Sequence, residues 1–287
     1  MTTQHIAIYG KGGIGKSTTT SNIAAALAES GLKVVQIGCD PKSDSTNTLR
    51  QGSYLPTVLD TARDGGRVKL EDIAVPGFKG VLCIEAGGPV PGVGCAGRGI
   101  NAAIELLREL RLFETFQPDV VLYDVLGDVV CGGFAVPIRE GLTDRVYVVT
   151  SSDFMAIYAA NNLFRAITKY APSGGAKLGG IIANSISAPY AHSLIEDFAQ
   201  VTGTRAVDYI PRSTTVAQAE LYGQTVIEAN PGSPQADVYR RLAQQILTDT
   251  GAGIPKPLAA NDLRTWARKW GDLIIRTDQA FQADQVI

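Results

Sequence analysis

A glycine-rich segment near the N-terminus carries the chemistry of phosphate binding. The pattern G-x-x-x-x-G-K-[ST] is matched by Gly10-Lys11-Gly12-Gly13-Ile14-Gly15-Lys16-Ser17, between an apolar run and a helical pattern. Glycines let successive backbone N–H groups turn inward, and the helix N-terminus adds partial positive charge. We expect Lys16 to meet the β- and γ-phosphates of a nucleotide, Ser17 to ligate Mg²⁺ and Thr18 to join the nucleotide site. A glycine-rich turn without ligand is the alternative.

Two aspartate-containing runs have the chemistry to serve a phosphate-bound metal ion. Asp40 and Asp44 lie in a turn after the second apolar run, and Asp124 and Asp128 follow the apolar run 120–123. A carboxylate at such a strand end can hold a Mg²⁺-bound water or orient the attacking water. We expect Asp124 to contact Mg²⁺ through water, and Asp128 and Asp40 to act on the hydrolytic water. Helix capping is the alternative for Asp40 and Asp44.

The four cysteines divide into two kinds. Cys95 and Cys131 lie in glycine-rich loops, and a [4Fe–4S] cluster generally takes four thiolates, so two chains together would complete one cluster on a dimer axis. Because Cys131 closely follows Asp128, loss of the γ-phosphate would be transmitted mechanically to whatever Cys131 holds. Cys39 and Cys83 sit at strand ends among apolar residues, and we predict that both are buried packing cysteines.

The elements that must position these residues alternate along the chain. Short β-branched runs occupy residues 5–9, 33–37, 81–85, 119–123, 145–150, 178–183 and 205–210, and helical patterns occupy 17–29, 100–112, 155–170, 191–201 and 235–247. This alternation predicts an α/β fold with a mostly parallel sheet flanked by helices, whose ligands bind at the carboxyl ends of the strands. We predict one P-loop NTPase domain over residues 1–250 and a C-terminal extension, 251–287, with a short helix around 262–275.

Composition limits the classes of partner. The 287 residues carry a formal net charge of -2, which disfavours nucleic acid and membrane as partners, because both attract clustered basic surfaces. No apolar run approaches the roughly 20 residues that cross a bilayer, and no leader precedes the first strand. Four cysteines are too few for a disulfide scaffold. We therefore expect a cytoplasmic protein.

A second lysine inside the phosphate loop, Lys11, resembles a feature of a dimeric ATPase family that includes partition ATPases, septum-site ATPases and the nitrogenase iron protein. In that family the extra lysine reaches the nucleotide of the other subunit, so the resemblance implies a homodimer in which hydrolysis depends on assembly. A solvated surface lysine is the alternative.

The resemblance to the nitrogenase iron protein is more specific. It covers residues 5 to about 250 and rests on the phosphate loop, Gly38-Cys39-Asp40-Pro41-Lys42, both cysteine loops and the run 123–137. It implies MgATP in each subunit and a [4Fe–4S] cluster held by Cys95 and Cys131 of both. It also implies a larger catalytic partner, a heterotetramer, and ferredoxin or flavodoxin as electron source. By position, the resemblance further implies adenine recognition by Asn184 and an adenine-side loop beginning at Pro211 and Arg212. Arg98 matches an exposed arginine of the family that takes part in docking and in some organisms is ADP-ribosylated; a plain surface arginine is the alternative.

Several positions depart from the family pattern, and they bear on which enzyme this chain would supply with electrons. Residues 185–190 replace a charged stretch, Ser213 stands where the family has aspartate, and Ala183 where it has cysteine. These changes favour the reductase component of a nitrogenase-like enzyme such as methylthio-alkane reductase, with the iron protein of true nitrogenase as the alternative. A partition-type ATPase switch without redox function is an alternative of another class, but it has no need for Cys95 and Cys131.

Overall fold

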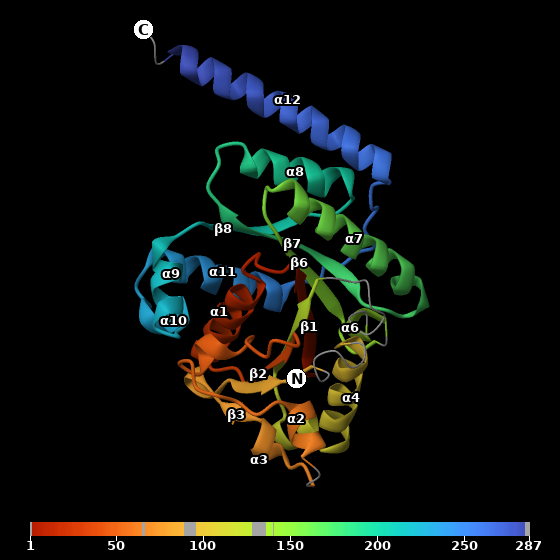
Figure 1. The fold of residues 1–287 in the computed structure, drawn as a ribbon, viewed down its shortest axis with the longest axis vertical. Helices are drawn as coiled ribbons and strands as arrows, with labels where there is room; N and C mark the ends of the chain where they lie inside the picture. The colour runs from red at the N-terminus through yellow and green to blue at the C-terminus, as the bar shows by residue number, and fades with distance from the viewer. Residues whose placement is uncertain (1, 65–66, 89–95, 128–135, 140, 285–287) are drawn as a thin grey trace.

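The computed structural model describes residues 2–64, 67–88, 96–127, 136–139 and 141–284, and within them it contains an eight-stranded sheet in the order β3-β4-β2-β5-β1-β6-β7-β8. Only β3 is antiparallel to its neighbour among these strands, so the predicted mostly parallel α/β fold is confirmed (Figure 1). The strands are β1 (Gln4–Gly10), β2 (Val34–Cys39), β3 (Val75–Pro76), β4 (Leu82–Glu85), β5 (Val120–Leu126), β6 (Arg145–Thr150), β7 (Lys177–Ile186) and β8 (Ala206–Pro211).

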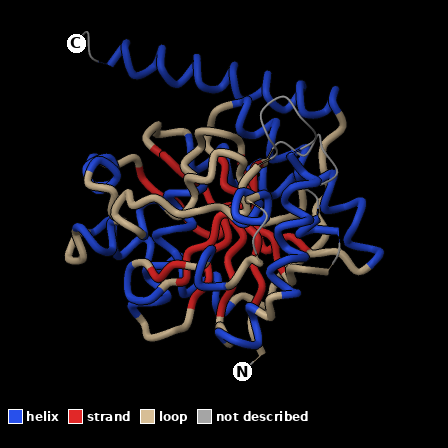
Figure 2. The backbone as a smooth tube through the Cα atoms, turned by 60° about the horizontal axis from the view of Figure 1, so that its bottom comes forward, coloured by secondary structure: helices blue, strands red, loops and turns tan. Residues whose placement is uncertain are grey.

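Helices cover both faces of the sheet, which Figure 2 shows as a central strand layer between helices. The helices are α1 (Lys16–Glu29), α2 (Val58–Arg63), α3 (Leu70–Ile73), α4 (Ala96–Glu109), α5 (Leu112–Phe116), α6 (Val136–Arg139), α7 (Phe154–Tyr170), α8 (Ala191–Val201), α9 (Thr214–Leu221), α10 (Val226–Ala229), α11 (Pro234–Thr248) and α12 (Ala260–Asp284). The helices α1, α4, α7, α8 and α11 lie at the predicted helical patterns. Several short ones escaped prediction because one or two turns show no measurable periodicity.

The central strand β1 shows how the two faces are built. Ile6 and Ile8 pack in one apolar cluster with residues of α1 and α11, whereas Ala7 and Tyr9 pack in a second cluster with residues of α4 and α7. Successive side chains of a strand point to opposite faces, so a strand buried on both faces must be apolar at every position. This burial fixes β1 in the sheet and places the phosphate loop at its carboxyl end.

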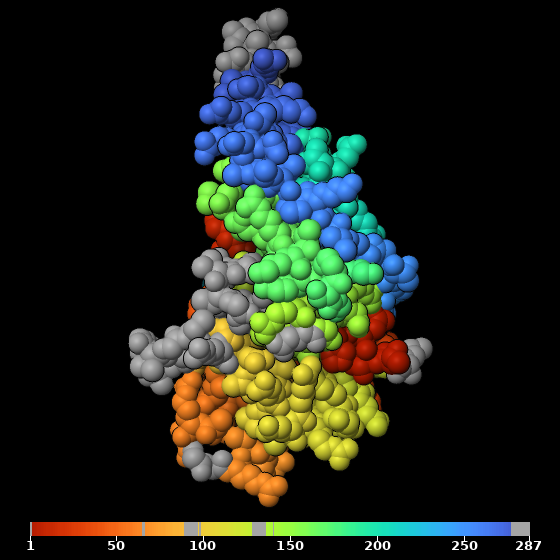
Figure 3. Space-filling model, turned by 90° about the vertical axis from the view of Figure 1, so that its right-hand side faces the viewer, coloured from red at the N-terminus to blue at the C-terminus, as the bar shows by residue number. Residues whose placement is uncertain are grey.

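The C-terminal helix differs from its prediction. The sequence predicted a short helix around residues 262–275, but α12 extends from Ala260 to Asp284 and projects beyond the rest of the molecule (Figures 1 and 3). No proline interrupts it, and Gly271 alone costs only about 1 kcal/mol in a helix. Its first half is anchored, because the indole N–H groups of Trp266 and Trp270 donate to Asp197 Oδ2 of α8 at 2.8 and 2.6 Å. The division of the chain at residue 250 stays a prediction.

Across the described residues, no helix combines the length and apolar character that crossing a bilayer requires.

Candidate functional site

One cavity of about 430 Å³ opens at the carboxyl ends of the strands. Its volume falls in the range of roughly 300–1,000 Å³ that is usual for small-molecule sites. It brings together most of the residues that the sequence predicted for nucleotide binding: Lys11, Gly12, Gly13, Ile14, Gly15, Lys16, Ser17, Thr18, Asp40, Asp44, Asn184, Pro211 and Arg212. These residues follow β1 and β2 or lie at the carboxyl ends of β7 and β8, so the sheet edge assembles segments that lie far apart in the sequence.

The phosphate loop curls tightly between β1 and α1. Gly13 and Gly15 have φ angles of 77° and 84°, a left-handed conformation that residues with a Cβ rarely adopt. The bond from Thr19 N to Gly15 O, 2.9 Å long, closes the first turn of α1, so the N–H groups just before it have no intrahelical acceptor. Such groups at a helix start suit an anion. Lys11 is exposed and lines the same cavity.

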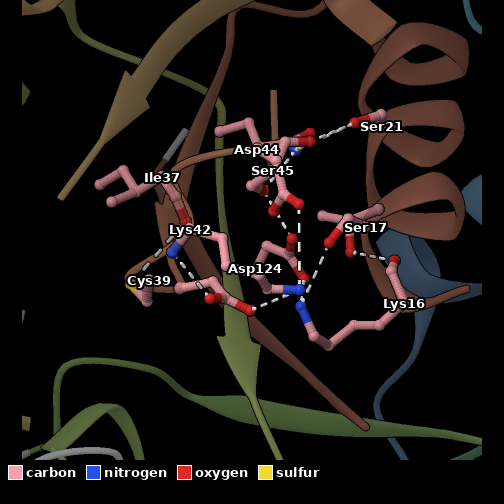
Figure 4. A network of polar contacts seen from close by, with 12 residues as sticks. Lys16, Ser17, Ser21, Ile37, Cys39, Lys42, Asp44, Ser45 and Asp124 are labelled. Atoms are coloured by element: carbon pink, nitrogen blue, oxygen red, sulfur yellow. Dashed lines mark hydrogen bonds and ion pairs between the residues drawn. The ribbon is translucent and has the colours of Figure 1, made fainter. Parts of the chain in front are cut away.

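A buried ion pair joins the phosphate loop to β5. Lys16 Nζ contacts Asp124 Oδ1, and the two side chains are only 5% and 0% exposed (Figure 4). Lys16 Nζ also lies 3.4 Å from Ser17 Oγ, and the Ser45 hydroxyl donates to Asp124 Oδ2 at 2.6 Å. Buried charges require this kind of pairing, because each would otherwise lose its hydration without compensation. The arrangement places the lysine, hydroxyl and carboxylate expected for a magnesium–phosphate site within contact of one another.

Three polar residues that sequence reasoning missed support this pair. Gln36 of β2 donates through Nε2 to Ser21 Oγ, Ser45 O and Ser45 Oγ, each at 3.1 Å, and Ser21 Oγ donates to Ser45 O at 2.9 Å. All three side chains are buried. The available signal was a glutamine inside the otherwise apolar run of β2, since a buried amide must find hydrogen-bond partners.

The two aspartates after β2 occupy different environments. Asp40 is 4% exposed and accepts the backbone N–H of Lys42 at 3.0 Å, which stabilises the turn. The Asp44 side chain is 53% exposed. Lys42 Nζ lies 3.6 Å from the Asp40 carboxylate and 3.9 Å from that of Asp44. Both carboxylates line the cavity, Asp40 as a fixed group and Asp44 as a solvated one.

The opposite side of the cavity is built from β7, β8 and α9. Asn184 Nδ2 donates to the carbonyl of Ile14 at 2.7 Å, which leaves the amide oxygen as an acceptor. Pro211 ends β8, and Arg212 N donates to the carbonyl of Ile186 at 3.0 Å. The Thr18 hydroxyl donates to Glu220 of α9. These contacts hold the phosphate loop against the segment predicted to face adenine.

The predicted packing role of two cysteines is confirmed. Cys39 and Cys83 are both fully buried, and burial raises the pKa of each thiol, that of Cys83 to about 12. Cys95, Asp128 and Cys131 lie outside the described residues. Arg98 falls in the first turn of α4, and its side chain also lies outside the described part.

Fold and site together define a phosphate-loop nucleotide-binding protein: a parallel α/β sheet whose first strand runs into the loop, with Lys16, Ser17 and Asp124 in contact at its carboxyl edge. The model of the family described as 4Fe-4S iron sulfur cluster binding proteins, NifH/frxC family, matches residues 4–271, and the chain belongs to this family.

Curated relatives agree with this assignment. The chain is 59% identical to nitrogenase iron protein 2 of Paenibacillus durus over 96% of this chain and 94% of the relative. It is 49% identical to nitrogenase iron protein 2 of Methanothermococcus thermolithotrophicus over 93% of this chain and 96% of that one. It is thus an ATP-hydrolysing reductase component of this type, with a [4Fe–4S] cluster and MgATP as its cofactors.

Solved structures share the fold at low identity. The cell division ATPase MinD of Pyrococcus furiosus superposes with a TM-score of 0.66 at 19% identity, covering 85% of this chain and 98% of that one. Cobyrinic acid a,c-diamide synthase of Mycobacterium smegmatis gives 0.62 at 19% identity, covering 86% and 94%. Proteins with different functions carry this fold, so this likeness shows the architecture alone.

Proposed function

We propose that this chain is the iron protein of a nitrogenase: a homodimer that uses MgATP to pass single electrons from a shared [4Fe–4S] cluster to a larger heterotetrameric catalytic protein. Ferredoxin or flavodoxin supplies the electrons. The observation that carries the proposal is the buried Lys16–Asp124 pair, which ties the phosphate loop to the strand that continues toward Asp128 and Cys131.

The pair provides a switch because a phosphate competes for the same lysine. With MgATP in the cavity, Lys16 would pair with the β- and γ-phosphates in place of Asp124, and Ser17 and Asp124 would be the residues that hold the Mg²⁺ ion, whose charge would stabilise the phosphates. The Ser45 hydroxyl still donates to Asp124 and limits the cost of losing the ammonium group. The end of β5 adjusts to this exchange, so the chain beyond it responds to the nucleotide.

The remaining nucleotide-site residues have distinct roles in the proposal. Lys11, exposed beside the cavity, reaches the nucleotide of the partner subunit and makes hydrolysis depend on the dimer. Asp40 and Asp128 position the attacking water, and Asp44 completes the carboxylate set. The Asn184 amide oxygen, left open by its bond to Ile14, accepts the adenine amino group. Pro211 and Arg212 begin the loop on that side.

The cysteine chemistry supports Cys95 and Cys131 as the cluster ligands. A ligand must be a thiolate, and burial opposes deprotonation at Cys39 and Cys83. Of the four cysteines in the chain, Cys95 and Cys131 therefore remain as donors. The cluster stores and releases one electron at a time. Arg98, in the first turn of α4, contributes to docking and is a candidate for ADP-ribosylation.

The choice between nitrogenase and an organic-sulfur reductase rests on the named relatives and on the positions where this chain departs from the family pattern. Both bacterial and archaeal relatives above carry the name nitrogenase iron protein. Two departures that favoured methylthio-alkane reductase have local explanations: Ser213 caps α9 by accepting Thr215 N, as an aspartate would, and Ala183 is buried in β7. Residues 185–190 remain the feature that favours an organic-sulfur reductase, so the two pathways require a direct test.

The first experiment tests the donor function. Protein purified without oxygen is expected to hold about four irons per dimer and to transfer electrons to its catalytic partner only with MgATP. Lys16→Ala should abolish ATP-driven transfer and leave the iron content unchanged, while Lys69→Ala, at an exposed pair with Glu71, should change neither. Iron-free protein with full ATPase activity would instead indicate a partition-type switch.

A second experiment tests the pathway. The amount of this protein in its native cells is measured under fixed-nitrogen limitation and, separately, under sulfate limitation. Induction by nitrogen limitation is expected for a nitrogenase. Induction by sulfate limitation alone would replace this assignment with an organic-sulfur reductase.

A further inference from the structure

A buried carboxyl group lies at the end of β4, outside the cavity. Glu85 is 0% exposed, and its Oε1 accepts both the backbone N–H and the hydroxyl of Thr46 at 2.7 Å. The pKa of Glu85 is raised to about 7: burial is the largest cause and the charge of Asp124 acts in the same direction, whereas the bonds from Thr46 and the charge of Arg50 oppose the rise. An ionisable group in such a place is costly, which points to a role that an apolar side chain would not fill.

Glu85 connects a segment that lines the nucleotide cavity with a segment that leads toward a cysteine loop. Thr46 belongs to the aspartate loop (residues 40–46), which contains Asp40 and Asp44 and lines the nucleotide cavity. Glu85 begins the exit segment (residues 85–88), from which the chain continues toward Cys95. The two hydrogen bonds from Thr46 thus join the nucleotide side of the molecule to the strand that precedes a cysteine loop.

The two segments are also packed closely. Ala86 N donates to the carbonyl of Gly38 at 2.8 Å, just before the aspartate loop. A Cβ on Gly38 would lie 2.6 Å from Ser45 Cβ and would overlap the Glu85 carboxylate. A Cβ on Gly88 would lie 2.7 Å from Pro41 Cβ. Neither segment can shift far without displacing the other, because close-packed interiors transmit such movements.

Arg50 is the third side chain of this junction. Its Nε donates to Thr46 Oγ1 at 3.1 Å. Among the described residues, its Nη1 and the Oε2 of Glu85 are buried without a hydrogen-bond partner. Both side chains are hydrogen-bonded to Thr46 through another of their atoms, so a movement of the aspartate loop would change the hydrogen bonds of Arg50 and Glu85 together.

We propose that Glu85 is a positioning residue that makes the aspartate loop and the exit segment respond to the nucleotide as one unit. This inference rests on the proposed function, since MgATP must act on the aspartate loop. It adds a second route from the nucleotide, toward Cys95, beside the route from Asp124 toward Cys131.

Hydrogen exchange of the full-length protein, with and without MgATP, tests the proposal. In the wild type, MgATP is expected to slow exchange in the aspartate loop and in the exit segment together. Thr46→Val removes the hydroxyl at nearly constant volume, and it should reduce the response of the exit segment by about tenfold, as for the loss of one buried hydrogen bond. The response of the aspartate loop should persist.

Glu85→Gln is the second variant, for the case that Thr46→Val fails to fold. It keeps an acceptor for Thr46 and removes the ionisable carboxyl group, whose charge Arg50 favours, so the response of the exit segment should again decrease. The matched control is Asp208→Asn, at a buried carboxylate of β8 that pairs with Arg241 at 2.8 Å. This control should leave both responses unchanged.

The outcomes separate this inference from the proposed function. Absence of any MgATP response in the aspartate loop of the wild type would overturn both. Three other outcomes would overturn the role of Glu85 alone. In the wild type, MgATP could slow exchange in the aspartate loop but not in the exit segment. Thr46→Val and Glu85→Gln could both respond like the wild type, or Asp208→Asn could lose as much of the exit-segment response as they do.

Discussion

Replacing Lys16 by methionine should destabilise the protein far more than an ordinary lysine substitution. The ammonium group pairs with Asp124, and both side chains are almost fully withdrawn from water. Methionine retains the length of the side chain and removes the charge, so Asp124 stays buried without its main partner. Removing one partner of a buried ion pair costs roughly 3–5 kcal/mol.

The Ser45 hydroxyl reduces this cost. It continues to donate to Asp124 at 2.6 Å, and a hydrogen bond to a charged group contributes about 1.5–3 kcal/mol. We therefore place the loss for Lys16→Met at the low end, about 3 kcal/mol. The double variant Lys16→Met/Asp124→Asn removes both charges and should recover most of this loss, because an uncharged buried pair is close to neutral in stability.

The assay is denaturant unfolding followed by tryptophan fluorescence at one protein concentration. Trp266 and Trp270 are the two tryptophans of the chain, and both pack against α8, away from the mutated site. The control is Lys69→Met, whose exposed pair with Glu71 should contribute less than about 1 kcal/mol. A loss below about 1 kcal/mol for Lys16→Met, or equal losses in the single and double variants, would refute the buried-pair reasoning.

Three further predictions concern the surroundings of the site. Folding raises the pKa of Glu85 from 4.5 to about 7. The folded protein therefore binds the proton of Glu85 more tightly than the unfolded chain, and this contribution to the free energy of unfolding is complete below pH 4.5 and is lost as the pH rises through 7. Glu85→Gln should remove about 3 kcal/mol of this pH dependence, which unfolding measured across that pH range would show. Gly38→Ala should cost about 1–3 kcal/mol through overlap with Ser45 and the Glu85 carboxylate, whereas Gly232→Ala, which meets no neighbour, should be nearly neutral; equal effects would contradict the contact argument. Cys39 and Cys83 should resist iodoacetamide in the native protein and react on unfolding, as mass spectrometry would show, because burial raises both thiol pKa values; rapid native labelling would count against their burial.

Much of the site could be predicted from local patterns in the sequence. The phosphate loop was recognisable because the glycines, Lys16 and Ser17 occupy neighbouring positions that one turn of backbone brings together. The buried strands were recognisable because a central parallel strand is apolar on both faces, as in β1 and β5. The packing role of Cys39 and Cys83 followed from the same apolar surroundings.

Contacts between distant segments were decided by the tertiary structure. Lys16 and Asp124 are 108 residues apart, and they meet because β5 lies between β1 and β2, an order that no local spacing specifies. The same order brings Ser45 to Asp124, and the pairing of β2 with β4 brings Glu85 to Thr46. The sequence by itself thus determined the phosphate chemistry and the buried strands, because short-range spacing encodes both. The strand order decided which charges pair in the interior, because it sets which loops lie next to each other at the carboxyl edge of the sheet.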